Sequence, residues 1–130
     1  MKEKDKEVLL KDLSARLPYG VKFETPTGID ILKGIDHFGK FDCTINPIDD
    51  NSYDVEDIKP YLFPMCTMTK EQKNEYHELV GGMFGTSVLI NFEFLEDFFY
   101  RNHLDCKGLI PMGLALDATG KNIYIDYAQR

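Results

Sequence analysis

Three neighbouring residues have side chains that could support nucleophilic chemistry. His103, Asp105 and Cys106 lie in one short stretch, and an imidazole beside a thiol is how cysteine nucleophiles are activated. Neighbours in sequence seldom present their side chains to each other at the required geometry, and no glycine pattern of an oxyanion hole lies nearby. We interpret His103 as a helix C-terminal residue favoured by the dipole, and Asp105 as the cap of the next turn. We therefore expect no catalytic residues and no enzymatic activity.

A second group of candidate residues is acidic. Asp49, Asp50, Asp54, Glu56 and Asp57 lie close together, and calcium prefers several carboxylate oxygens on a short loop. The order of an EF-hand is not met, because neither Asp49 nor Asp50 is followed by Gly at the sixth place and Glu at the twelfth. We expect a solvated acidic loop that could contact a basic partner.

Other metal and phosphate motifs are incomplete. His37, His77 and His103 are too far apart for metal-ligand spacing. The glycines between residues 81 and 85 lack the Lys of a phosphate-binding loop, so we expect Gly81 and Gly82 to end a helix. The sequence predicts no metal and no cofactor.

An aromatic segment between two prolines allows two interpretations. Pro60 and Pro64 disfavour helix in the residues before them, so we expect residues 61–65 to form an ordered, irregular crossing between two halves of the chain. The segment either packs as a staple between these halves or forms an exposed apolar patch for a partner. The candidate partner surface combines this segment with the acidic loop and comprises Tyr61, Phe63, Met65, Asp49, Asp50, Asp54 and Asp57.

The first half of the chain predicts one helix followed by a β-meander. Leucines recur every four residues within 3–17, which is helical spacing. Alternating apolar residues predict antiparallel strands at 21–25, 29–35 and 40–45. A fourth, edge strand is expected to begin at Tyr53.

The second half is expected to be mainly helical. Thr69 followed by Gln72 is a capping-box pattern that predicts a helix start. We interpret the apolar run 88–92 as a buried strand and residues 93–102 as an amphipathic helix. Short turns should follow, with a terminal strand over 123–127. The predicted fold is α+β, a small curled antiparallel sheet packed against three to four helices, and an SH3-like half barrel is one form it could take.

Composition narrows the class of partner. The chain has 130 residues and a formal net charge of -7, so we expect a single domain, residues 1–130, and generic nucleic-acid binding is disfavoured. Three widely spaced cysteines suggest reduced thiols rather than a disulfide framework. Neither a signal peptide nor a membrane span is recognisable. We expect a cytoplasmic protein with a protein partner and no membrane association.

Three stretches give the chain a resemblance to a known group: residues 11–21, residues 58–65 running into 68–69, and residues 103–110 with 113–116. Pro18-Tyr19-Gly20-Val21 and the longer stretch from Lys59-Pro60-Tyr61-Leu62 to Met65 are specific in order and spacing. The chain resembles a family of small uncharacterised proteins common in Bacteroides-type bacteria, their prophages and other mobile elements. The resemblance covers most of the chain and implies no activity. It also implies that Phe63, Cys66 and the pair Cys106-Lys107 stand where family members often carry other, polar residues.

The resemblance and the composition together suggest a function. We expect a non-enzymatic accessory or interaction protein of a phage or mobile element that binds a host or phage macromolecule. The alternative is a defence-evasion protein that acts by nucleic-acid charge mimicry or by nucleotide sequestration. The oligomeric state does not follow from the sequence.

Overall fold

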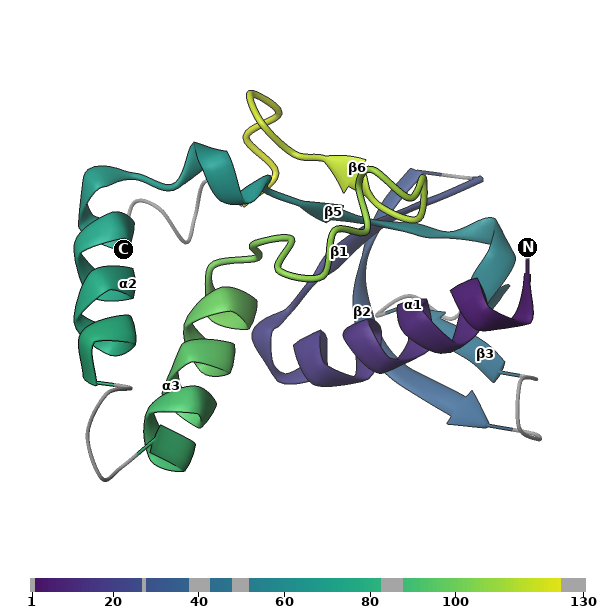
Figure 1. Cartoon of the computed structure of the whole chain (residues 1–130). Helices are drawn as coiled ribbons and strands as arrows, with labels where there is room; N and C mark the ends of the chain where they lie inside the picture. The colour runs from purple at the N-terminus through teal and green to yellow at the C-terminus, as the bar shows by residue number, and fades with distance from the viewer. Residues whose placement is uncertain (1, 27, 38–42, 48–51, 83–87, 125–130) are drawn as a thin grey trace.

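The computed structural model describes residues 2–26, 28–37, 43–47, 52–82 and 88–124. Within these residues, three α-helices and a six-stranded mixed sheet form an α+β fold, which confirms the predicted class. The sheet occupies one side of Figure 1, and the helices α2 and α3 form a hairpin on the other side.

The N-terminal helix α1 (Glu3–Arg16) covers one face of the sheet, as Figure 1 shows. Leu9 and Leu13 are four residues apart and therefore lie on one side of the helix, where both are fully buried. A short 3-10 turn (Leu17–Tyr19) ends the helix, and Gly20 reverses the chain with φ 68°, a left-handed conformation that suits glycine. The predicted helix is confirmed.

The first strands form the predicted antiparallel meander, although residues 40–42 of the predicted third strand lie outside the described residues. Strands β1 (Lys22–Thr25), β2 (Gly28–His37), β3 (Cys43–Pro47) and β4 (Tyr53–Asp54) pair in sequence order. The pairing of β2 with β3 is irregular between Leu32 and Gly34. The fourth strand is at the sheet edge, as predicted, but a 3-10 turn (Val55–Asp57) follows it directly.

The proline-flanked segment differs from the prediction, because it begins with a strand. Strand β5 (Lys59–Leu62) pairs antiparallel with β1 and parallel with β6 (Leu116–Asp117). Pairing with β6 includes only Tyr61 and Leu62, so the N–H that Pro60 lacks is not needed on that side. The parallel pair makes the sheet mixed, and β4 and β6 form its two edges rather than joining as a barrel.

The apolar run 88–92 is helical, so the prediction of a strand there is wrong. It forms the start of α3 (Val88–Arg101), which continues through Leu95 and Phe98. A short apolar run fits a buried strand and a buried helix equally, and the helical spacing that follows it decides between them. The helix α2 (Lys70–Gly82) ends in the predicted glycine pair and lies beside α3.

The predicted terminal strand lies partly outside the described residues. Ile123 and Tyr124, which are described, lie in a turn rather than a strand. Residues 109–113 form the expected turns, and β6 follows them.

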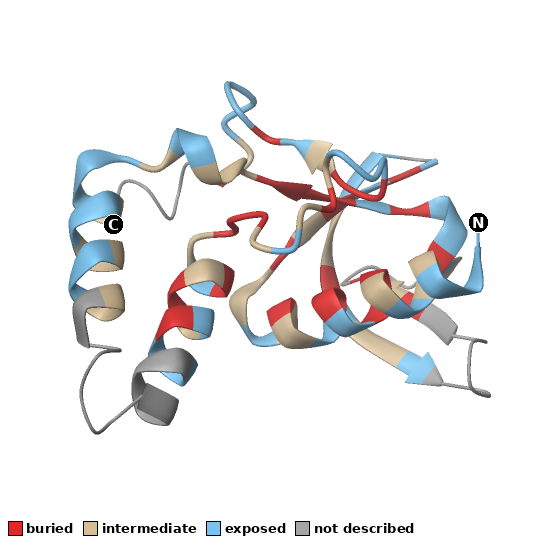
Figure 2. Ribbon diagram, in the orientation of Figure 1, coloured by how far each residue is buried: buried red, intermediate tan, exposed pale blue. Residues whose placement is uncertain are grey.

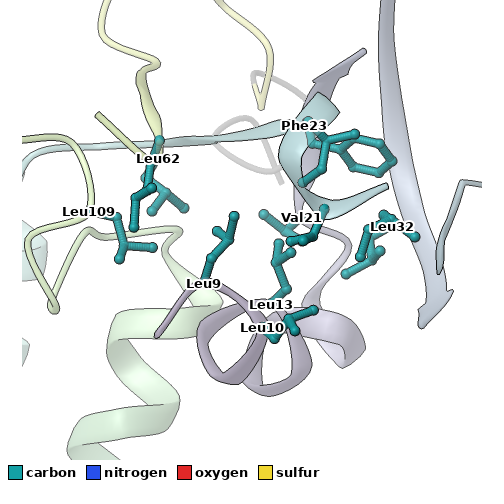
Figure 3. Packing of buried hydrophobic residues seen from close by; sticks show 13 residues of the cluster. Leu9, Leu10, Leu13, Val21, Phe23, Leu32, Leu62 and Leu109 are labelled. Carbon is teal, nitrogen blue, oxygen red and sulfur yellow. The ribbon is translucent and has the colours of Figure 1, made fainter. Parts of the chain in front are cut away.

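Buried residues form one large apolar cluster and two smaller ones. Figure 2 shows buried positions along α1, β5 and the inner side of α3. The large cluster lies between α1 and the sheet, and Figure 3 shows Leu9 and Leu13 pointing toward Val21. A second cluster joins Leu95, Phe98 and Leu104 at the helical hairpin. None of the helices in the described residues is long and apolar enough to cross a membrane.

Candidate functional site: a cleft beside the helical hairpin

A cleft of about 290 Å³ lies where the helical hairpin meets the end of β5. Segments far apart in the sequence supply its walls: the residue after β5, the first turn of α2, the end of α3 and the turns after β6. Its lining residues are Phe63, Thr67, Thr69, Gln72, Arg101, Asn102, His103, Leu104, Ala118, Gly120, Asn122 and Tyr124.

One wall of the cleft is aromatic. Tyr124 stacks on His103 with ring centroids 3.8 Å apart and an interplanar angle of 13°, and its ring also lies 5.8 Å from that of Phe63. The Tyr124 hydroxyl donates to the Tyr61 carbonyl oxygen at 2.9 Å and accepts from the Lys22 backbone N–H at 2.7 Å. These bonds to β1 and β5 fix the ring that forms the wall.

Another part of the lining consists of hydroxyl and amide groups. The Thr69 hydroxyl accepts from the Gln72 N–H at 3.1 Å, and the Gln72 side-chain oxygen accepts from the Thr69 N–H at 2.8 Å. This reciprocal pair is the capping box that the sequence predicted. The Gln72 amide also donates to the Asn102 side-chain oxygen at 3.2 Å, which ties the start of α2 to the end of α3.

Arg101 adds a charged side chain to the lining. Its Nη2 lies 2.5 Å from a Glu75 carboxylate oxygen, and its Nε lies 3.7 Å from a carboxylate oxygen of Asp97. Asp97 also accepts a short hydrogen bond from the Tyr19 hydroxyl. Two carboxylates therefore surround one guanidinium, and the local net charge of the three side chains is negative.

The loop after α3 is held against β5 by backbone bonds. The Phe63 N–H donates to the His103 carbonyl at 2.8 Å, and the Asp105 N–H donates to the Phe63 carbonyl at 2.9 Å. His103 has φ 56°, which turns the chain into this pairing. Arg16 Nη2 donates to the carbonyl oxygen of Leu104 at 2.6 Å from the other side. The loop therefore has little freedom to move away from the cleft.

Arg16 itself is fully buried and paired. Its Nε donates to Asp12 at 2.7 Å, both side chains have 0% exposure, and its guanidinium lies 5.0 Å from the Tyr100 ring centroid. This pair joins α1 to α3 and to the loop behind the cleft.

His103, Asp105 and Cys106, the three residues with potential for nucleophilic chemistry, have surroundings that fit structural roles. The Asp105 carboxylate accepts from the N–H groups of Leu109 at 2.7 Å and Ile110 at 2.9 Å, as the predicted cap of the next turn. Burial, together with the nearby charges of Arg16 and Lys22, lowers the pKa of His103 to about 4. The imidazole is thus neutral at pH 7, which differs from the expectation of a charge favoured by the helix dipole.

Cys106 is not activated as a nucleophile. Burial raises the pKa of its thiol, even though Arg16 and Lys107 act in the opposite direction. A raised pKa leaves less of the reactive thiolate at neutral pH. The side chain is half-buried, whereas the Cys66 thiol is exposed.

The residues of the candidate partner surface lie in different places and differ in exposure. Tyr61 is buried in β5, as in the staple interpretation. Phe63 and Met65 are partly buried against the helical cluster, and Phe63 alone among the predicted residues lines the cleft. Asp54 and Asp57 are exposed before β5 begins, away from the Phe63 end of that strand, and Asp49 and Asp50 lie outside the described residues.

Most cleft residues carried no sequence signal. Arg101 and Asn102 are neighbours at the end of α3, and only the fold brings them together with Phe63 and Tyr124. Gln72 was recognisable, but as a helix cap. Among the described residues, no group of three or more His, Cys, Asp and Glu side chains could hold a metal ion.

No family model, curated protein or solved structure matches this chain. The resemblance to the Bacteroides and prophage family stays a prediction.

Proposed function

We propose that this chain is a non-enzymatic binding protein that recognises a protein partner through the cleft. The observation that carries the proposal is the composition of the cleft: its lining combines aromatic rings with amide and hydroxyl groups that are largely bonded to one another. Such a site binds by burial and shape, with few polar contacts to fix orientation. The proposal agrees with the neutral imidazole of His103 and the protonated thiol of Cys106.

The charges beside the cleft favour a neutral side chain over a nucleotide. A phosphate group would meet the carboxylates of Glu75 and Asp97 beside Arg101. A protein that inserts one uncharged residue fits this feature better than a sequestered nucleotide does.

A role in a phage or mobile element remains part of the proposal. It rests on the resemblance of the Pro-Tyr-Gly-Val and Lys-Pro-Tyr-Leu strings and on no contact in the cleft. The partner would then be a host or phage protein.

The experiment is affinity capture from cells that naturally express the protein, with three versions of the tagged chain. Thr67 is exposed and lines the cleft, so Thr67→Tyr should obstruct it. Lys73 is exposed on α2 and does not line the cleft, so Lys73→Tyr is the matched control.

The expected result is a protein retained by the wild type and by Lys73→Tyr but lost with Thr67→Tyr. Amide shifts of Phe63 and Asn102 on addition of that purified protein would then locate it. A partner retained equally by all three versions would refute recognition through the cleft. A co-purifying nucleotide that only Thr67→Tyr loses would favour the sequestration alternative instead.

A further inference from the structure

We infer that the group received by the cleft is a tyrosine side chain of the partner, with its ring against the aromatic wall and its phenol oxygen accepting a hydrogen bond from Arg101. This inference rests on the proposed function and names the chemistry of its partner.

The walls first select an aromatic group. Phe63 and Tyr124 meet at an interplanar angle of 57°, which leaves an angled aromatic corner rather than a flat surface. Aromatic rings prefer such edge-to-face and offset arrangements, with centroids about 4.5–7 Å apart. Leu104 and Ala118 also line the cleft, although both are buried and offer little surface of their own. A third ring placed there would extend the aromatic cluster.

The polar groups of the cleft favour a ligand that carries a hydrogen-bond acceptor. The side-chain oxygens of Gln72 and Asn102 already accept hydrogen bonds, from Thr69 and Gln72 respectively. Arg101 has only donors, and its Nη1 forms no hydrogen bond with any residue that the structure describes. The Thr69 hydroxyl accepts from Gln72, and its proton is likewise not donated within the described residues. Arg101 and Thr69 thus carry donor hydrogens that no described residue accepts, and an acceptor on the incoming group can use them.

This pattern distinguishes among the aromatic side chains. The indole N–H of tryptophan only donates, and phenylalanine has neither donor nor acceptor, whereas a phenol oxygen accepts. The ring of tyrosine therefore fits the wall and its oxygen fits the donors.

The charged side chains beside the cleft favour a neutral phenol over an anionic ligand. The Arg101 guanidinium is paired with Glu75 at 2.5 Å and lies 3.7 Å from Asp97. A phosphate or carboxylate would be repelled by two carboxylates and attracted by one cation, whereas a neutral oxygen meets only the donor. The whole chain carries a net charge of -7, which favours a tyrosine in a neutral or basic segment of the partner.

The test uses small probes and the full chain. N-acetyl-tyrosine amide, its O-methyl derivative, N-acetyl-phenylalanine amide and AMP are each titrated while the amide resonances of Phe63, Asn102 and Ala118 are followed by NMR. We expect the tyrosine probe to bind about tenfold more tightly than the phenylalanine probe, which is the effect of one hydrogen bond to a charged group. The O-methyl probe keeps the acceptor and should retain most of this gain.

Two variants test whether the tighter binding of the tyrosine probe depends on Arg101. Arg101→Met keeps the aliphatic stem and removes the donors, so the tyrosine and phenylalanine probes should bind equally. Glu75→Gln removes the same ion pair but keeps the guanidinium, so the tenfold preference should persist. Loss of the preference in both variants would overturn the role of Arg101, because the common change would then be the lost ion pair.

The remaining outcomes separate the two proposals. Equal binding of the tyrosine and phenylalanine probes in the cleft would overturn the phenol inference and leave cleft binding intact. Tighter binding of AMP at these amides would overturn the tyrosine inference in favour of a nucleotide. If no probe shifts these amides, the tyrosine inference fails, and the capture experiment with Thr67→Tyr decides the proposed function separately.

Discussion

The half of the molecule under α1 and the half around the cleft are held together by different interactions. Under α1, leucines of the helix and apolar residues of the sheet pack in one cluster, and Leu9, Leu13, Val21 and Phe23 are fully buried. Around the cleft, two smaller apolar clusters are joined by side-chain amides and backbone bonds. The cluster under α1 contains more buried residues and contributes more to stability, since this contribution scales with buried apolar area.

The largest effect is expected where these halves meet, at the buried pair of Arg16 and Asp12. Arg16→Met should lower the free energy of unfolding by about 3–5 kcal/mol, because it leaves the Asp12 carboxylate buried without its cation. Urea denaturation followed by circular dichroism measures the change.

A double variant provides the control for this pair. Asp12→Leu combined with Arg16→Met removes both charges and should recover most of the stability, as apolar replacements of buried ion pairs often do. A cost below about 1 kcal/mol for Arg16→Met alone would contradict a role for the pair in joining the halves.

The next effect concerns pH and the aromatic wall. The pKa of His103 is lowered to about 4 by burial, whereas an unfolded chain has a histidine pKa of about 6.5. Between these values the unfolded state binds more protons, so stability falls as pH decreases through this window. The control is His103→Asn, because asparagine tolerates the positive φ. Relative to this variant, the free energy of unfolding of the wild type should fall by about 3 kcal/mol between pH 7.5 and pH 4.

Thermal unfolding of both proteins across this pH range checks the effect. His77 is exposed on α2, and His77→Asn should follow the wild-type curve. If the difference in stability between the wild type and His103→Asn is the same at both ends of the pH range, His103 is not held neutral by the fold.

The smallest effect should be confined to the helical half. Thr69→Ala removes the hydroxyl that accepts from the Gln72 N–H and should cost about 1 kcal/mol. Hydrogen exchange should quicken at the first turn of α2 and stay unchanged in β1, if the two halves are stabilised separately. Thr119→Ala, at an exposed threonine outside any helix, should change stability by less than about 0.5 kcal/mol. Faster exchange throughout the sheet would show that the halves are not separable.

The local patterns of the first half made it predictable. Leucines four residues apart and alternating strand residues between short turns specify α1 and the meander without long-range information. The capping box specified the start of α2 for the same reason, since Thr69 and Gln72 bond to each other.

The errors occurred where distant contacts decide the structure. Strand β5 depends on β1 and β6 as partners, and β6 is contributed by Leu116 and Asp117, so the prolines around it were the only local signal. Residues 88–92 form a short, mainly apolar run that fits either conformation, and they begin α3. The cleft was not predictable, because Phe63, Arg101 and Tyr124 meet only in the folded chain.

The hydrogen bond between the Tyr124 hydroxyl and the Tyr61 carbonyl also affects the order in which the chain can fold during translation. The meander and β5 can pair as soon as they emerge, but the aromatic wall needs a residue made much later in the chain. A nascent polypeptide shorter than 124 residues therefore lacks the wall of the cleft, even when its sheet has begun to fold. The proposed recognition of a partner would then wait until translation has passed that tyrosine.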